Sequence, residues 1–201
     1  MIDRFVIIVT VVLVLVCGYY YWSSQYEEVT IVKSTINNKK YLVQNKKDKK
    51  QAADLLATVS EKLNKLVAYL VNKHQDNQDV ARLNARFNAN HITESSYKNK
   101  YTSYSINKGE KIVFCLRSRD EQEKLIDLNT IMFVALHEIT HIMTKSIGHT
   151  EEFWRNFKFI LQESVELGIY KRDEYSKNPK KYCGIMITHS PLEWISFINF
   201  N

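Results

Sequence analysis

The chain has 201 residues, of which 45% are hydrophobic, 12% aromatic and 25% charged, with five glycines and two prolines. This composition excludes a largely disordered, low-complexity or collagen-like chain, and the length allows one globular domain plus an additional segment. The formal net charge of +6 would suit a nucleic-acid-binding protein if the basic residues were spread over the fold. However, seven lysines and a single acid, Asp48, between residues 30 and 50 carry the whole excess. A nucleic-acid partner is therefore not expected.

The first predicted element is a membrane anchor at residues 1–22. Residues 5–22 contain no charge and end in four aromatic residues, as is typical of a membrane interface. A helix over them would be about 27 Å long, close to the ~30 Å hydrocarbon core of a bilayer. A cleaved signal peptide would need a basic start and small residues at its cleavage site, which this segment lacks. We predict a single-pass transmembrane helix at 5–22, with a cleaved signal or a buried core helix as the alternatives.

Residues 23–50 are polar and rich in lysine, and we interpret them as a juxtamembrane connector to a domain at residues 51–201. Basic flanks of a membrane span tend to stay cytoplasmic, so we expect the domain on the cytoplasmic side, with the lysines near anionic lipid headgroups. The absence of an Asn-x-Ser/Thr sequon agrees with this orientation. Cys17 lies in the anchor, and we expect the remaining pair, Cys115 and Cys183, to form no disulfide framework.

The domain itself begins with an amphipathic helix. Apolar residues recur with a helical period over 51–74, and residues 80–87 could form a further short helix. Residues 101–106 and 111–117 are β-branched and aromatic, and the Asn-Lys-Gly sequence at 107–109 between them predicts a β-hairpin.

Two helices follow the hairpin. One is predicted over residues 130–145, with Asn129 or Asp127 as its N-cap and Gly148 after its end. The other is predicted over residues 151–167, between Thr150 as N-cap and Gly168. A short strand at 184–188 and an apolar tail from residue 192 complete a chain of the α+β class.

The sequence His137-Glu138-Ile139-Thr140-His141 within the first of these helices is the strongest functional signal. Histidines at i and i+4 lie one above the other on a helix, so both imidazoles can bind one zinc ion. Glu138 can face a zinc-activated water and remove its proton as a general base. The helix formed by the preceding residues would be apolar on nearly all of its faces, which indicates that it is buried. Polar groups on a buried helix need bonding partners. We therefore favour a catalytic zinc site over hydrogen-bonded core histidines.

A third zinc ligand must come from elsewhere in the chain. Thr144 and Ile147 occupy the positions where the metzincin pattern has Gly and His, which excludes that class. We favour His149, because Gly148 would allow a turn that swings it back toward the metal. Glu163 or Glu166 on the following helix is the alternative.

These residues resemble a known family. The HExxH sequence, a third histidine at 149 and a helix that opens with Phe153-Trp154 are similar to the SprT-like and WLM zinc metallopeptidases, over about residues 112–161. Seven residues separate His141 and His149 here, where WLM proteins usually have five. The chain also looks like WLM-type proteins of large DNA viruses, for which the membrane would be that of the virion or the host.

The resemblance implies a small zincin-like domain with an active-site helix, a short β-sheet or hairpin and a following helix. It also implies that His137, His141 and His149 bind Zn²⁺, that Glu138 is the catalytic base, and that the substrate is a protein or peptide. In similar peptidases the strand edge beside the active helix pairs with the substrate backbone. The strand at 111–117 could serve as this edge or could be an ordinary internal strand.

Other polar residues are weaker candidates. Tyr170, Tyr182 or His189 could donate a hydrogen bond to an oxyanion, and the sequence does not choose among them. We expect the isolated histidines to be structural or surface residues: His74, His91 and His189.

Two functions are consistent with these sequence features. The first is a membrane-anchored zinc peptidase with Glu138 as its base, and the second is a membrane-tethered interaction protein with a fold-stabilising metal site. A purely structural site needs no glutamate between its ligands and is usually closed by four ligands, often cysteines. We therefore favour the peptidase, with oligomeric state and substrate left open.

Overall fold

The structure is a computed structural model that describes residues 2–193; the apolar tail noted above lies mostly outside this range. Its fold is of the expected α+β class. The α-helices are α1 (Ile2–Glu27), α2 (Lys49–Lys73), α3 (Gln78–Arg86), α4 (Leu128–Met143) and α5 (Glu151–Glu166). The strands are β1 (Val29–Lys33), β2 (Lys40–Gln44), β3 (Ile92–Glu94), β4 (Ser103–Ile106), β5 (Lys111–Phe114), β6 (Lys180–Tyr182) and β7 (Ile185–Ile187).

The predicted helices over 51–74, 80–87, 130–145 and 151–167 are confirmed as α2 to α5, with ends that shift by a few residues. The caps explain two of the boundaries. The Asp127 side chain accepts the Thr130 N–H at the start of α4, and the Thr150 hydroxyl accepts the Phe153 N–H at the start of α5. Gly168 follows α5 with a φ of +70°, which suits the end of a helix.

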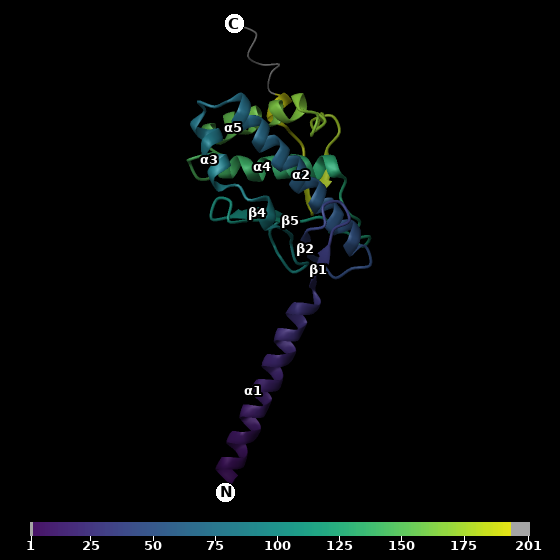
Figure 1. Ribbon diagram of the computed structural model, residues 1–201. Coiled ribbons are helices and arrows are strands. Elements are labelled where there is room, and N and C mark those ends of the chain that lie inside the picture. The colour runs from purple at the N-terminus through teal and green to yellow at the C-terminus, as the bar shows by residue number, and fades with distance from the viewer. Residues whose placement is uncertain (1, 194–201) are drawn as a thin grey trace.

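The core lies where α2, α4 and α5 pack together above the strands (Figure 1). Leu56, Leu63 and Leu70 of α2 lie two turns apart on one face and are completely buried. Ile131, Leu136 and Ile139 of α4 are also completely buried, so α4 runs through the core. Each such side chain stabilises the fold by about 1.5–3 kcal/mol. The sequence His137–His141 is thus held on a rigid element.

The central sheet has the strand order β3-β5-β4. β3 pairs with β5 in parallel, and β4 pairs with β5 antiparallel, with Ser105 opposite Ile112. The predicted hairpin is therefore confirmed as β4 and β5. Of the two interpretations of the strand at 111–117, the internal strand is correct, because β5 has a neighbour on each side. β3 and β4 are the two edge strands of this sheet, and the free edge beside α4 belongs to β4.

The lysine-rich segment differs from the polar connector that the sequence predicts. β1 and β2 form an antiparallel hairpin in which Val29 lies opposite Gln44. Tyr41 and Val43 point into the core against α2, while the lysines remain on the outside. The short apolar run Tyr41-Leu42-Val43 is the strand signal in the sequence, and the lysines on either side of it hide this signal.

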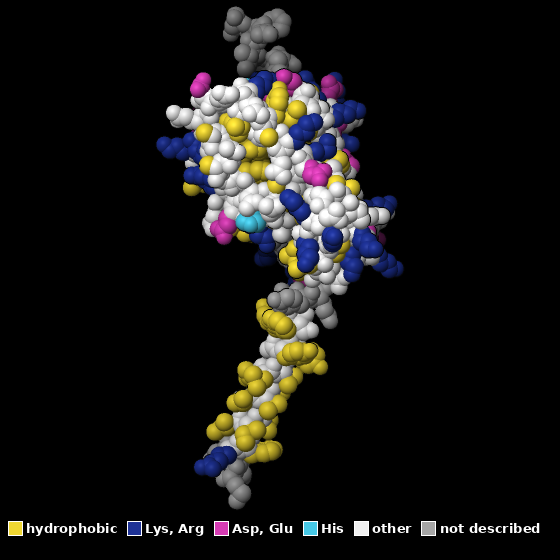
Figure 2. Space-filling model, viewed as in Figure 1, with side chains coloured by type: hydrophobic (Ala, Val, Ile, Leu, Met, Phe, Trp, Pro, Cys, Tyr) yellow, Lys and Arg dark blue, Asp and Glu magenta, His cyan; other side chains and the backbone are white. Residues whose placement is uncertain are grey.

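The helix α1 projects away from the rest of the chain (Figure 1). Residues 4–23 form a helical segment that is apolar enough and long enough to cross a membrane. Their side chains are exposed or nearly so, because the rest of the chain covers them little or not at all. Figure 2 shows apolar side chains along the helix and Lys and Arg side chains on the adjoining part of the body. A single residue separates the end of α1 from the start of β1, so the basic β1–β2 hairpin directly follows the helix.

The expectation that the cysteines form no disulfide is wrong. Cys115, after β5, and Cys183, between β6 and β7, are 68 residues apart in sequence and are joined by a disulfide. Folding brings the end of β5 against a β6–β7 hairpin, of which the sequence predicts only the second strand. Disulfides persist mainly in oxidising compartments, so the cysteines do not support a cytoplasmic orientation.

Candidate metal centre and peptide cleft

Two helical turns of α4 and the loop after it bring three histidines together. His137 and His141 lie one turn apart on α4, with Nε2 atoms 3.1 Å apart. After α4 the chain turns at Gly148, which has a φ of +83°, and places the His149 Nε2 3.0 Å from that of His137. The candidate ligand atoms all lie within 4.8 Å of one another.

The surroundings of the histidines favour neutral imidazoles. Burial, reinforced by the charges of the neighbouring histidines, lowers the pKa of His137 to about 3. Burial and the nearby charges of His149 and Lys108 lower the pKa of His141 to about 4. At neutral pH both rings are therefore free to donate a lone pair to a metal. Three converging imidazole nitrogens suit zinc, whose tetrahedral N–Zn–N geometry at 2.0–2.1 Å places ligand nitrogens about 3.4 Å apart.

Glu138 lies beside the first of these histidines and is 6% exposed. Burial raises the pKa of its carboxyl to about 7, and a hydrogen bond from the Ser105 backbone N–H partly opposes this effect. Ser105 is in β4, so the free edge of the sheet and the carboxylate are in direct contact. A carboxyl group with a pKa near 7 can both accept and return a proton at neutral pH.

A cleft of about 810 Å³ covers these residues. Its floor is α4, and the segments around it are β4 with its following turn, residues 146–149, and the β6–β7 hairpin with residues up to His189. The hydroxyl of Tyr182, at the end of β6, is hydrogen-bonded to the Ser103 hydroxyl of β4. The hairpin is thus attached to the edge strand β4 through this contact and to the end of β5 through the Cys115–Cys183 disulfide.

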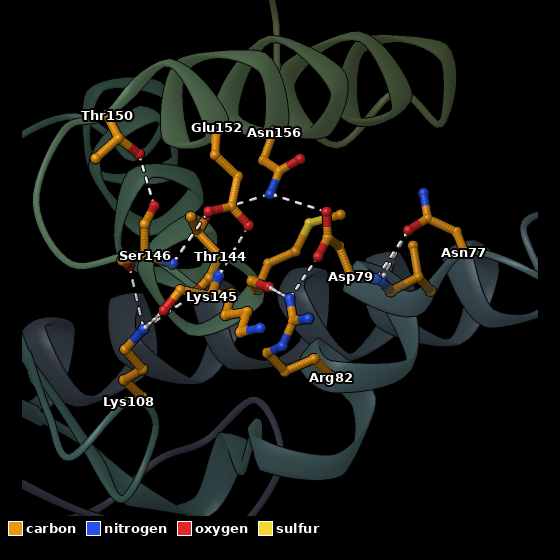
Figure 3. A network of polar contacts seen from close by, with 12 residues as sticks. Asn77, Asp79, Arg82, Lys108, Thr144, Lys145, Ser146, Thr150, Glu152 and Asn156 are labelled. Atoms are coloured by element: carbon orange, nitrogen blue, oxygen red, sulfur yellow. Dashed lines mark hydrogen bonds and ion pairs between the residues drawn. The ribbon is translucent and has the colours of Figure 1, made fainter.

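A network of polar contacts fixes the loop that carries His149 (Figure 3). The Lys108 ammonium donates to the carbonyls of Thr144, Lys145 and Ser146 at 2.9, 2.7 and 3.2 Å. From the other side, the Glu152 carboxylate accepts the backbone N–H groups of Lys145 and Ser146 at 3.1 and 3.0 Å. The loop is therefore held between β4's turn and the first turn of α5.

Hydrogen bonds to Ser146 and Lys145 lower the pKa of Glu152 to about 2, so this carboxylate is ionised across the neutral range. Asn156 extends the same network to α3, because its side-chain amide donates to Asp79 at 3.3 Å and to the Thr144 hydroxyl at 3.2 Å. Arg82 completes it with a bond to the Met143 carbonyl at 2.6 Å. The end of α4 is thus fixed from three directions.

The alternative third ligands lie elsewhere. Glu163 forms an ion pair with Lys73 of α2 at 3.0 Å and lies 3.1 Å from the Nε2 atom of His74, which directly follows α2. Glu166 pairs with Lys73 at 2.8 Å and accepts a hydrogen bond from the Tyr69 hydroxyl at 2.9 Å. Both carboxylates therefore join α5 to α2, and neither is among the cleft residues.

The other polar residues that the sequence offered as candidates lie partly inside and partly outside the cleft. Tyr182 and His189 line the cleft, and His189 is exposed there, as expected of a surface residue. Tyr170 is buried against Tyr175 and does not line it. His74 contacts Glu163, and His91 contacts the Glu110 carbonyl at the surface.

Sequence reasoning missed Lys108 and Glu152. The positive φ at Asn107 and Lys108 is the turn that directs Lys108 toward the loop, and the Asn-Lys-Gly sequence does signal that turn. The partners of these residues are backbone carbonyl and N–H groups, which leave no side-chain pattern in a sequence.

Comparisons with known proteins give the family. The WLM domain model matches residues 34–191, so the chain belongs to the WLM-domain family, which is metallopeptidase-like. The chain is 35% identical over 157 residues to uncharacterized protein R325 of Acanthamoeba polyphaga mimivirus, covering 76% of this chain and 79% of that protein. It is 34% identical over 97 residues to uncharacterized protein 136R of Invertebrate iridescent virus 6, covering 48% and 53%.

Wss1 from Saccharomyces cerevisiae is a similar solved structure, with a TM-score of 0.48 and 20% identity over 63% of this chain and 86% of that one. The family match and the viral relatives fit a WLM-type protein of the kind found in large DNA viruses.

Proposed function

We propose that this chain is a membrane-anchored zinc peptidase in which His137, His141 and His149 hold the metal and Glu138 is the general base. The convergence of three histidine nitrogens beside a buried glutamate, inside a cleft, is the observation that carries the proposal. A zinc ion held there would polarise the scissile carbonyl and lower the pKa of a water molecule.

The chain's own residues supply the remaining steps. Glu138 is placed to accept a proton from water and to return it to the leaving amine, which its pKa of about 7 allows. The free edge of β4 would pair with an extended substrate backbone and hold it over α4. Tyr182 and His189 line the cleft and are candidates for a hydrogen bond to the developing oxyanion.

The ligand set is tested by the zinc content of purified variants. We expect one zinc per chain in the wild type, a marked loss in His149→Ala, and full occupancy in Glu163→Ala. The second variant is a matched control because Glu163 was the alternative ligand and lies on the α2 side of α5. Zinc lost from Glu163→Ala and kept in His149→Ala would contradict the assignment.

We also propose that residues 5–22 anchor the protein in a membrane, with the globular domain after the anchor and its lysine-rich β1–β2 hairpin at the membrane surface. The lysine-rich hairpin supports a cytoplasmic domain, whereas the Cys115–Cys183 disulfide supports an oxidising compartment. Protease digestion of sealed, protein-containing membrane vesicles distinguishes the two sides. A chain released by alkaline carbonate would contradict the anchor.

A non-catalytic interaction protein with a structural metal site is the alternative. It offers no reason for a buried glutamate with a raised pKa beside the ligands, or for a cleft above them.

A further inference from the structure

The cleft above the histidines is poor in free charge, although a quarter of the chain is charged. Of the Lys, Arg, Asp and Glu residues that the structure describes, only Lys108 and Glu138 line it. The Lys108 ammonium is occupied by three carbonyls of the α4–α5 loop, and Glu138 is buried beside the proposed metal ligands. Neither side chain is therefore placed to recognise a charged group on a ligand.

Apolar side chains stand exposed around the same cleft. Ile147, in the α4–α5 loop, is 87% exposed, and Ile185 and Met186 of β7 are 51% and 50% exposed. Single exposed apolar residues are normal on a protein surface, but three around one cleft indicate a binding surface. They come from two different segments, so a ligand in the cleft would contact both.

The shape of the cleft indicates which ligand would fit. The free edge of β4 is four residues long, or about 13 Å at ~3.3 Å per residue. It offers backbone N–H and C=O groups to a ligand, apart from the Ser105 N–H, which the Glu138 carboxylate accepts. Contacts from both sides fix it, through Tyr182 to Ser103 and through Lys108 to the α4–α5 loop. An extended peptide can pair with such an edge while its alternate side chains reach neighbouring pockets.

We propose that the cleft selects extended peptide segments with large, uncharged apolar side chains next to the scissile bond. Ile147, Ile185 and Met186 are the specificity-determining contacts. This inference rests on the proposed peptidase function and adds the class of substrate.

The test is a binding measurement on the full chain carrying Glu138→Gln, loaded with zinc and inserted in lipid nanodiscs. Two fluorescent ten-residue peptides share the same flanks, and their four central residues are either Leu, Phe, Leu and Val or Asp, Ser, Glu and Lys. Empty nanodiscs correct for peptide bound to lipid. We expect the apolar peptide to bind at least about tenfold more tightly, since it buries several apolar side chains.

The variant Ile185→Ser with Met186→Ser should remove most of this preference. Ile36→Ser is the matched control, because Ile36 is also 51% exposed but lies between β1 and β2, outside the cleft. A further variant, Met186→Glu, should shift the preference toward a peptide with central lysines. Equal affinity for the two peptides, or an effect of Ile36→Ser as large as that of the cleft variant, would overturn the inference.

The outcome separates this inference from the proposed function. Selective binding by the Glu138→Gln chain, with no cleavage of either peptide by the zinc-loaded wild type, would support the cleft assignment and contradict the peptidase. Cleavage of both peptides at equal rates would support the peptidase and contradict the selectivity.

Discussion

Removal of the Cys115–Cys183 disulfide, by Cys115→Ala together with Cys183→Ala, should destabilise the domain and release the β6–β7 hairpin first. The bond closes a loop with a sequence separation of 68 residues. For a loop of this size, the lost chain entropy of the unfolded state corresponds to about 4 kcal/mol, and measured effects are commonly 2–4 kcal/mol. About 3 kcal/mol lowers the melting temperature of a domain of this size by about 6–12 °C.

The assay is thermal unfolding followed by near-ultraviolet circular dichroism, with and without reductant. Hydrogen exchange should show the loss of protection concentrated in residues 180–187, whose strands are only three residues each. Cys17→Ala is the control, because Cys17 is an exposed, free cysteine in α1.

Alkylation of the unreduced, unfolded protein provides an independent check, since only Cys17 should be labelled. Labelling of all three cysteines, with identical melting temperatures in the presence and absence of reductant, would refute the disulfide and its role in the cleft.

Three further predictions concern the elements around the site. Glu152→Gln should speed amide exchange at Lys145 and Ser146, whose N–H groups its carboxylate accepts. Because the pKa of Glu152 in the folded state is lowered to about 2, this carboxylate protects the two amides fully above about pH 4.5, and the protection disappears as the pH falls toward 2. Near pH 2 the wild type and the variant should therefore exchange alike. Gly109→Ala should cost more than about 2 kcal/mol in denaturant unfolding, because its φ is +115° and a Cβ would lie 2.6 Å from a backbone oxygen. Gly148→Ala should cost only about 1 kcal/mol, since its φ is +83° and no atom lies within 4 Å; equal costs for the two glycines would contradict this reasoning. Tyr182→Phe should lower kcat with zinc content unchanged, whereas Tyr170→Phe, outside the cleft, should leave kcat unchanged.

Much of the fold could be predicted because its signals are local. Helical periodicity and caps such as Asp127 and Thr150 locate α4 and α5 within a few residues. Spacing alone places His137 and His141 on one face of α4. These features depend on neighbours within four residues along the chain.

The parts that could not be predicted depend on distant residues. Cys115 and Cys183 meet only after β6 and β7 fold onto the end of β5. Which strand forms the sheet edge follows from the pairing of β3 with β5, across a separation of about 20 residues. The β1–β2 hairpin was hidden because its lysines dominate the composition, while only Tyr41 and Val43 reveal its buried face.

The most direct test of the central claim is cleavage of an unfolded protein, such as reduced and alkylated casein, by the zinc-loaded chain. Wild type and Glu138→Gln are compared at equal, measured zinc content, with the products identified by mass spectrometry. We predict new peptide termini with the wild type and a loss of at least about 100-fold in rate with Glu138→Gln. Equal cleavage by the two proteins, or none by either at full zinc occupancy, would contradict the proposal that this site is a peptidase.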